Sequence, residues 1–357
     1  MESRQNNFNI IRFCAAIMVM AGHMGTLIGV APLNFLGTSI NGEGIAIFFL
    51  IGGYLITKSW HADPHVPHYA IKRVFRILPS LIGYVVAATF VFGPFLSVLP
   101  AKEYFSSPLI GAYLKNIAFN VNFSLPGVFL QNPYAGVVNG SLWSLPVEIL
   151  MYFFVPVILF AFSRFPKNTK GYEVSLSVVT GIICALRIAQ ILLFPGWHFV
   201  VYSVDFAQVI AIIPYYFIGM LYTLPTLKKR LNLQVASVLL LLSLNMSMSA
   251  AKMELMRLVV IPYFVFSLAF AESPYFCKLF SKYELSYGMY LYGFFVQQAV
   301  IQIWGAERFS FTILLSVSII ITIFLSWLSS AFIERPAEKL KNNVLGLLKR
   351  KQSENRN

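Results

Sequence analysis

Charged side chains are scarce in this chain. Only 11% of its 357 residues are charged, whereas 58% are hydrophobic, and the mean hydropathy is +0.71. Soluble domains carry roughly 25% charged residues, so the composition excludes an ordinary soluble domain and indicates an integral membrane protein. The alternating pattern of a membrane β-strand is also missing, and several apolar runs of about 20 residues fit a bilayer core of roughly 30 Å as helices. We therefore expect an all-α fold, a polytopic transmembrane helical bundle.

Cysteine is almost absent as well. Cys14, Cys184 and Cys277 lie in or beside the expected spans and never in a Cys-x-x-Cys spacing, so we expect free thiols and neither a disulfide nor a zinc site. Histidines gather only in the segment 61–68, which also holds an aspartate. Its two prolines break any regular ligand face, so we expect a solvated cytoplasmic loop and no metal.

Acidic residues are few relative to basic ones. The chain has 14 Asp and Glu against 27 Lys and Arg, a net charge of +13. Such an excess can indicate binding to nucleic acid, but here the basic residues are dispersed between hydrophobic runs instead of forming a patch. We expect no nucleic-acid partner, and we attribute the charge to membrane topology.

Hydropathy and turn signals predict ten spans, near residues 8–30, 43–60, 76–99, 142–163, 173–194, 204–223, 233–250, 255–272, 284–303 and 309–333. The first run continues past the length of a signal peptide, so we expect it to remain as the first span. With a cytoplasmic N-terminus, most basic residues between the spans face the cytoplasm, which the positive-inside rule favours. The five exceptions are Lys102, Lys115, Lys252, Arg257 and Arg308. Both termini are therefore expected in the cytoplasm.

The longest stretch between spans is 100–141, whose apolar part, 108–121, is interrupted by polar residues. We expect an outer-face loop that lies across the site as a lid. No internal repeat is visible, so we expect one transmembrane domain over 1–340, followed by a basic cytoplasmic tail at 341–357. Glu334-Arg335-Pro336 predicts a helix stop, with a short amphipathic or disordered end near anionic lipid.

One apolar helix, 8–30, carries both Arg12 and His23. Eleven residues are about three turns, so the two side chains share one face and lie roughly 16 Å apart along the helix axis. Ionisable groups inside a span cost at least about 2.5 kcal/mol and usually face a wet or protein-lined interior. This face is a candidate active site. The alternatives are that Arg12 reaches the cytoplasmic interface and that His23 is a hydrogen-bonded packing residue.

A second cluster, Lys72, Arg73 and Arg76, lies at the cytoplasmic start of the third span. Arg73 and Arg76 are three residues apart, so on a helix their guanidinium groups can together grip a phosphate or pyrophosphate. The alternative is that these residues only satisfy the positive-inside rule.

A third cluster enters the fourth span from the outer face and ends at Glu148. This carboxylate lies about a turn and a half inside an apolar run, at a depth similar to that of His23, and it needs a partner or a proton. The alternative is a structural acid in helix packing. Arg187, inside the fifth span, is a second-rank candidate, and His198 is expected to be a lone interfacial histidine beside Trp197.

Six motifs follow one another along the chain: Arg12-x10-His23; Gly44-Ile-Ala-Ile-Phe-Phe-Leu-Ile-Gly-Gly-Tyr54-Leu-Ile-Thr57; Arg73-x-x-Arg76 with Pro79; Asn139-Gly-Ser-Leu-Trp-Ser-Leu-Pro-Val-Glu148; Ser286-Tyr287-Gly-Met-Tyr290-Leu291; and Phe332-Ile-Glu334-Arg-Pro336. Together they resemble the acyltransferase 3 family of membrane acyltransferases, which includes bacterial O-antigen and exopolysaccharide O-acetylases. The resemblance extends from about residue 6 to 340. It departs from the family at Gly293, where many members carry a histidine, so we expect no catalytic role in that region.

The resemblance implies a role for each site residue. His23 corresponds to the essential histidine, Arg12 to its companion, and Arg73 and Arg76 to the pair suspected of holding the acyl donor. Glu148 is the acid of the Trp-Ser-Leu motif. The residues of that motif that we expect to serve the acceptor site or the structure are Asn139, Ser141, Trp143 and Ser144.

We therefore expect a membrane O-acyltransferase of the bacterial inner membrane. It moves an acyl group, in particular acetyl, from cytoplasmic acyl-CoA to a hydroxyl of a surface carbohydrate or glycolipid near the outer face. Acyl-CoA is a co-substrate, and no bound cofactor is expected. His23 takes the proton of the sugar hydroxyl while Glu148 orients the imidazole, or His23 itself becomes acylated. The rival hypothesis is a transporter or flippase with an intramembrane relay.

Overall fold

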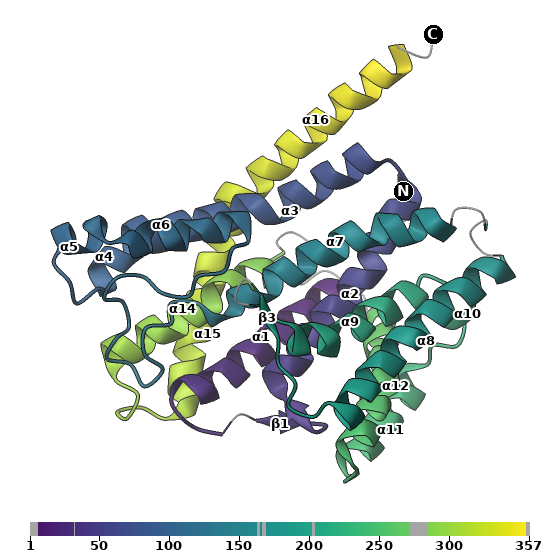
Figure 1. Cartoon of the computed structure of the whole chain (residues 1–357), viewed down its shortest axis with the longest axis horizontal. Helices are drawn as coiled ribbons and strands as arrows, with labels where there is room; N and C mark the ends of the chain where they lie inside the picture. The colour runs from purple at the N-terminus through teal and green to yellow at the C-terminus, as the bar shows by residue number, and fades with distance from the viewer. Residues whose placement is uncertain are drawn as a thin grey trace. The chain divides into compact units, whose positions relative to one another are not determined.

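The computed structural model describes residues 6–31, 33–162, 165, 169–201, 204–271 and 284–354. This part of the chain is helical almost throughout (Figure 1). Its strands are two short antiparallel hairpins, which pair β1 (Asn34–Phe35) with β2 (Thr38–Ser39) and β3 (Val200–Val201) with β4 (Val204–Asp205). The expected helical class is confirmed.

Each predicted span overlaps a helix of the structure. The main helices are α1 (Phe8–Leu27), α2 (Ile40–Ala62), α3 (Val66–Ala87), α7 (Ser144–Ala161), α8 (Lys170–Leu193), α9 (Phe206–Leu221), α11 (Leu233–Leu244), α12 (Ala250–Ala269), α14 (Ser286–Trp304), α15 (Phe311–Ser329) and α16 (Arg335–Glu354). Six helical segments of the described residues are long and apolar enough to cross a membrane, and α9 and α11 are apolar but shorter. The chain is therefore a helical membrane protein, while ten spans and cytoplasmic termini stay predictions.

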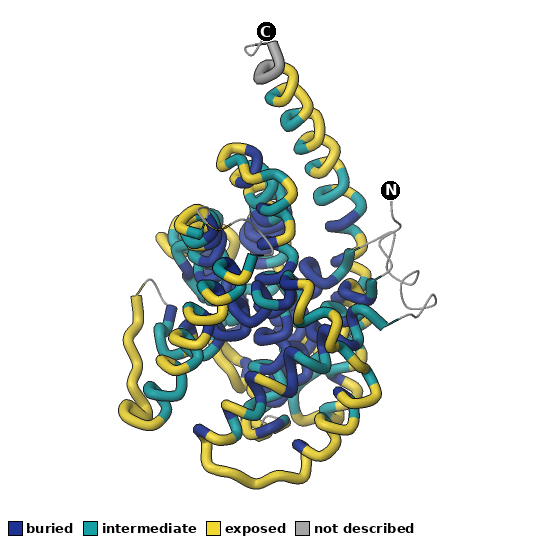
Figure 2. The backbone as a smooth tube through the Cα atoms, turned by 90° about the vertical axis from the view of Figure 1, so that its right-hand side faces the viewer, coloured by how far each residue is buried: buried dark blue, intermediate teal, exposed yellow. Residues whose placement is uncertain are grey.

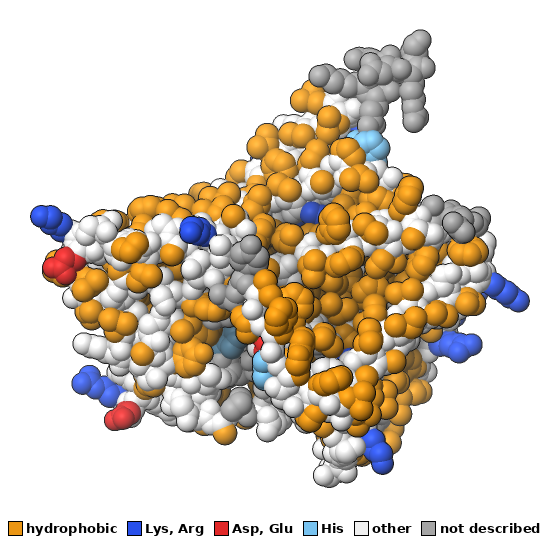
Figure 3. All heavy atoms as spheres, viewed as in Figure 1, with side chains coloured by type: hydrophobic (Ala, Val, Ile, Leu, Met, Phe, Trp, Pro, Cys, Tyr) orange, Lys and Arg blue, Asp and Glu red, His pale blue; other side chains and the backbone are white. Residues whose placement is uncertain are grey.

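Many of the helix surfaces are apolar and exposed, as contact with lipid requires. Hydrophobic side chains dominate the face drawn in Figure 3, and exposed backbone alternates with buried backbone along the helices in Figure 2. The α8 helix is the extreme case, because only 11% of its most apolar window is buried. Such helices are held by the one face that meets other helices, so the packing of that face decides the fold.

The chain divides into two compact units, each built from separate parts of the sequence. The first comprises Met1–Lys58 and Trp143–Lys282, and the second comprises Ser59–Leu142 and Tyr283–Asn357. In the first unit, α1, α2, α9 and α12 contribute most of a core of buried apolar residues. Aromatic rings meet there, since the centroid of Phe8 lies 5.2 Å from that of Tyr54 and 6.2 Å from that of Phe266.

Glycines bring α2 and α9 of the first unit into backbone contact. A Cβ added at Gly53 would lie 1.9 Å from the carbonyl oxygen of Tyr216, and one added at Gly219 would lie 2.0 Å from that of Leu50. Without a hydrophobic force between helices in lipid, such close approach supplies the van der Waals contact that holds them together. Any side chain at these two positions would force the helices apart.

The second unit is organised around α3, α14, α15 and α16. The α14 helix packs along α15, and α16 packs against α3. The chain after α3 continues through a π-helical turn, Ala88–Phe92, into α4 (Gly93–Leu96) and then into α5 (Ala101–Ser106) and α6 (Pro108–Leu114).

The segment 100–141 is anchored to α3 and the π-turn after it. The hydroxyl of Tyr104 donates to the carbonyl of Thr89 at 2.8 Å, and the hydroxyls of Tyr84 and Tyr113 lie 3.0 Å apart. All three tyrosines are almost completely buried. The segment is thus a packed part of its unit, and a role as a lid stays a prediction.

Two expectations about helix ends were wrong, both at proline. The segment 61–68 is a loop only at residues 63–65, because α2 runs to Ala62 and α3 starts at Val66. Pro67 stands in the first turn of α3, where its missing N–H costs nothing, and His68 is only 3% exposed. Glu334-Arg335-Pro336 does not stop its helix either, since a π-helical turn, Ser330–Glu334, leads directly into α16. Such a turn shifts the hydrogen-bond pattern ahead of the proline and lets the helix continue.

Gly53→Ala is expected to destabilise the folded protein by about 1–3 kcal/mol, because the new methyl group meets the Tyr216 carbonyl. Gly181→Ala is the matched control, since that glycine lies on α8 with no atom within 4 Å of its added Cβ. The control should be neutral or gain up to about 1 kcal/mol from helix propensity. Unfolding of both variants in matched detergent micelles measures the difference. Equal stability of the two would contradict the close α2–α9 contact.

Candidate functional site

Arg12 and His23 lie on one uninterrupted helix, α1, in the first unit. The imidazole of His23 is buried, with the residue 9% exposed. The guanidinium carbon of Arg12 lies 5.8 Å from the ring centroid of Phe48 on α2. Arg12 therefore faces another helix instead of lipid, at a distance typical of a cation–π contact.

The middle and the C-terminal part of α1 are held tightly against the beginning of α2. A Cβ at Gly22, the residue before His23, would lie 2.5 Å from the side-chain oxygen of Asn41, and one at Gly44 would lie 2.6 Å from the carbonyl oxygen of Ala15. Two close contacts along one helix pair leave α1 little freedom to rotate. They fix the direction in which His23 points.

Glu148 lies in the second turn of α7, and its carboxylate accepts a hydrogen bond from the hydroxyl of Tyr152 one turn later. Tyr152 is buried and was not among the candidate residues. The signal was available in the sequence, because residues four apart share a helix face. This hydrogen bond gives Glu148 the partner that its position required. A contact between Glu148 and His23 stays a prediction.

The motif before α7 is anchored to α14 within the second unit. The side-chain amide of Asn139 donates to the carbonyl of Leu291 at 2.7 Å, and its side-chain oxygen accepts from the N–H of Ser141 at 3.0 Å. The hydroxyl of Tyr290 donates to the carbonyl of Ser141. Asn139 and Ser141 are buried. These contacts give the two residues a structural task, the positioning of the turn from which Trp143, Ser144 and α7 continue.

The same start of α14 also contacts the basic cluster on α3. Arg76 forms an ion pair with Glu284 at 2.7 Å, and its guanidinium carbon lies 5.4 Å from the ring centroid of Tyr287. The hydroxyl of Tyr287 donates to the carbonyl of Ile77 at 3.0 Å. Residues 284–291 therefore connect two sequence motifs, a function that the sequence did not reveal.

The three basic residues of α3 have separate partners. Arg73 donates to the hydroxyl of Ser59 at 3.4 Å, and Lys72 forms an ion pair with Asp63 at 2.7 Å. His68 also bonds Asp63, at 3.2 Å. Burial raises the pKa of Asp63, but the hydrogen bonds from Lys72 and His68 outweigh it and lower that pKa below its ordinary value. The expected joint grip of Arg73 and Arg76 is thus not preformed, and an anion would have to draw them away from these contacts.

A buried ion-pair network crosses the first unit. Arg257 on α12 pairs with Glu43 at the start of α2 and, at 2.7 Å, with Glu254. Glu254 in turn accepts from Arg187 of α8 at 3.3 Å. Glu43 is completely buried. The network gives Arg187 an acidic partner, and it shows that the side chain of Arg257 is buried among acids, while the side of the membrane on which Arg257 lies stays a prediction.

The described residues were also compared with the ligand sets that metal ions require. Among the described residues no group of three or more His, Cys, Asp or Glu could hold a metal ion. Cys14 and Cys184 are free thiols, and Cys277 lies outside the described residues. His198 is not the lone histidine that the sequence suggested, because its ring bonds Asp205 at 2.6 Å.

Comparison with known proteins places these features in a family. Residues 5–331 match the acyltransferase domain of the acyltransferase 3 family. The chain is similar to an "O-acetyl transferase" of Shigella phage Sf6, 27% identical over 94% of this chain and 98% of that protein. It is similar to "Nodulation protein 10" of Rhizobium leguminosarum, 27% identical over 96% of both chains.

A shorter match joins the chain to a "Peptidoglycan O-acetyltransferase" of Listeria monocytogenes. The two are 26% identical over 48% of this chain and 26% of that protein. No solved structure matches the chain significantly.

Glu43→Gln and Arg257→Gln are each expected to destabilise the protein by about 3 kcal/mol or more, because either change leaves a buried charge without its partner. The double variant should lose less than the sum of the two, since it removes both charges. Chemical unfolding in detergent measures all three. Lys341→Ala is the control, because it breaks an exposed pair with Glu338 and should cost no more than about 1 kcal/mol. Additive losses for the two buried residues would refute the pairing.

Proposed function

Because this chain belongs to the acyltransferase 3 family of membrane acyltransferases, we propose that it transfers an acetyl group from cytoplasmic acyl-CoA to a hydroxyl group of a cell-surface carbohydrate. The enzyme class is an O-acetyltransferase, as in the phage relative. The observation that carries the proposal is the buried His23 on the same face of a membrane helix as Arg12. A base held in that way suits proton removal from an alcohol.

The donor and the acceptor approach the site from opposite sides of the membrane in this proposal. In the second unit the basic residues of α3 hold the phosphates of acyl-CoA, and in the first unit the sugar reaches the half of α1 that carries His23. Eleven residues of helix separate Arg12 from His23, a rise of about 16 Å, which an extended pantetheine arm can cover. The phosphates of the donor replace Ser59 as the partner of Arg73 and Glu284 as the partner of Arg76, since a phosphate offers each guanidinium two oxygens.

The chemical step then needs one base and one proton donor. His23 takes the proton of the sugar hydroxyl as its oxygen attacks the thioester carbonyl, so that a C–O bond forms and the C–S bond breaks. The imidazolium returns the proton to the departing CoA thiolate. Glu148, held by Tyr152, stabilises the positive charge that His23 carries during this step. In the alternative route His23 itself accepts the acetyl group and passes it on.

His23→Ala is expected to lower acetyl transfer by about 10²- to 10⁴-fold, because a positioned base typically contributes that much. The assay combines the purified protein with [¹⁴C]acetyl-CoA and with surface polysaccharide from the bacterium that produces the protein, after removal of the O-acetyl groups. Thr26→Ala is the matched control, since that exposed residue lies one turn further along α1. Near-normal transfer by the His23 variant would remove the residue from the chemistry. Absence of acetyl transfer by the wild type would favour a transporter instead.

Replacing Arg73 and Arg76 together by lysine is expected to raise the KM for acyl-CoA about tenfold or more, because lysine offers a point charge instead of a planar fork. Turnover at saturating donor should remain close to that of the wild type if the arginines contribute uniform binding. Charge and topology are unchanged in this variant.

Glu284→Gln serves as the companion variant. It breaks the ion pair of Arg76 while keeping the guanidinium. A lower or unchanged KM for acyl-CoA is expected here, because the phosphate no longer competes with a carboxylate. If the double lysine variant titrates like the wild type, the two arginines serve topology and packing only.

A further inference from the structure

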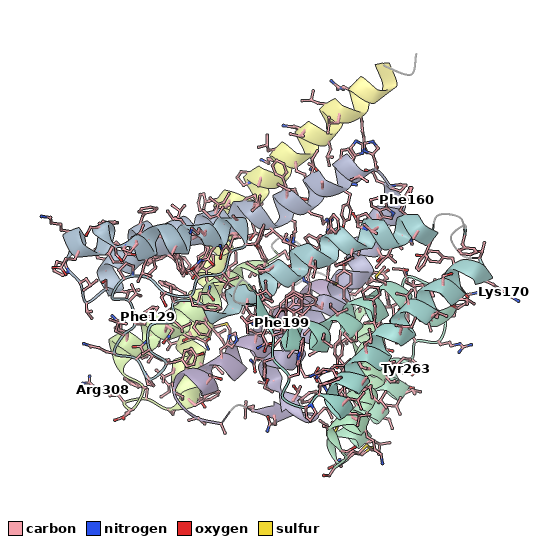
Figure 4. All side chains as sticks on the ribbon, viewed as in Figure 1. Phe129, Phe160, Lys170, Phe199, Tyr263 and Arg308 are labelled. Atoms are coloured by element: carbon pink, nitrogen blue, oxygen red, sulfur yellow. The ribbon has the colours of Figure 1, made fainter. Side chains whose placement is uncertain are left out.

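The connection between α8 and α9 carries two aromatic side chains at the surface of the protein, Trp197 and Phe199. Trp197 and Phe199 are 39% and 54% exposed, and their ring centroids lie 6.2 Å apart with planes inclined by only 25°. The planes of the two rings are thus nearly parallel, and both rings are partly accessible. The ring centroid of Phe199, which is labelled in Figure 4, also lies 5.7 Å from the ring centroid of Phe206. We call the described residues 197–201 and 204–206 the aromatic hairpin.

A polar pair stands beside these rings. Nδ1 of His198 lies 2.6 Å from a carboxylate oxygen of Asp205, and the other oxygen of Asp205 accepts from the N–H of Ala207 at 2.9 Å. Burial raises the pKa of Asp205, but its hydrogen bonds to His198 and Ala207 outweigh this and lower that pKa below its ordinary value. Asp205 is therefore fixed as the N-cap of α9, while the side chain of His198 is 66% exposed. The pair offers a rigid acceptor and an accessible ring nitrogen.

The hairpin lies next to the helix that carries the candidate acid. Strand β4 contacts both α9 and α7 within the first unit. Glu148 is on α7, near its start. The positive-inside prediction puts the α8–α9 connection and the start of α7 at the outer face of the membrane. A molecule held on the hairpin therefore approaches the site from the side of the acceptor.

We propose that the aromatic hairpin binds a pyranose ring of the acceptor glycan, an inference that rests on the proposed function. The C–H face of a pyranose is apolar and matches the flat surface of Trp197 and Phe199. Its hydroxyl groups both donate and accept, which matches the carboxylate of Asp205 and the imidazole of His198. The alternative occupant of exposed aromatic side chains is the lipid headgroup region. A hydrogen-bonded polar pair among the rings favours a ligand with ordered hydroxyl groups.

The test compares acceptor kinetics of Trp197→Leu and Trp197→Phe with those of the wild type. The probe is surface polysaccharide of the host, freed of its ester groups by mild alkali, with [¹⁴C]acetyl-CoA as donor. Leucine keeps the apolar character but loses the flat ring, so we expect at least a tenfold higher KM for polysaccharide. The turnover at saturating acceptor and the KM for acetyl-CoA should not change. Phenylalanine should restore most of the acceptor affinity.

The control is Phe309→Leu, because Phe309 is 40% exposed and lies outside the hairpin. Its kinetics should equal those of the wild type. If Trp197→Leu equals the wild type, or if both leucine variants lose activity alike as membrane anchors would, the inference is overturned while the acetyltransferase function stands. If the wild type itself transfers no acetyl group, the proposed function fails, and this inference fails with it.

Discussion

An ionisable side chain surrounded by hydrocarbon must find a partner inside the protein, and this requirement shapes the first unit. The insertion of one such group costs at least about 2.5 kcal/mol, so unpaired charges would disrupt the bundle. Arg257 reaches Glu43, 214 positions away in sequence, and Glu254 continues the chain of charges to Arg187. Helices α2, α8 and α12 are thereby bound together at their polar points. Apolar side chains that face lipid need no such partner. The α8 helix can therefore keep one apolar side almost fully exposed.

In the second unit, polar groups are also paired inside the protein, mostly through hydrogen bonds of neutral side chains. The first turns of α14 receive the Asn139 motif on one side and the basic part of α3 on the other. In each of these contacts the side chain of Asn139 or Tyr287 donates to a backbone carbonyl of another helix, which pairs a polar side chain inside the protein. Motifs that are far apart in the sequence thus prove to be parts of one hydrogen-bonded assembly.

Hydropathy predicted the helices because a backbone in lipid must satisfy its own hydrogen bonds, which leaves a helical sequence few alternatives. The shared helix of Arg12 and His23 followed from the same rule. Pairings across the chain could not be predicted, since nothing local in the sequence links Glu43 to Arg257, or Tyr290 to Ser141. The predictions made from Pro67 and Pro336 were wrong because proline does not always end a helix. It also fits the first turn of a helix, as at Pro67, and it is tolerated after a π-helical turn, as at Pro336. Glu148 was recognised as an acid in need of a partner, but not Tyr152 as that partner.

The length of the helix that begins with α3 has a consequence for the supply of substrate. Its 31 continuous helical residues, Val66–Leu96, extend about 46 Å, against a hydrocarbon thickness of roughly 30 Å. Lys72, Arg73 and Arg76 all lie in its first three turns. If the helix stands near the membrane normal, those turns project into water. Under the proposed function, a donor as hydrophilic as a nucleotide conjugate would then make its first contacts in the aqueous phase. Only its slender arm would have to enter the low-dielectric interior, and the whole donor would not have to partition into the membrane.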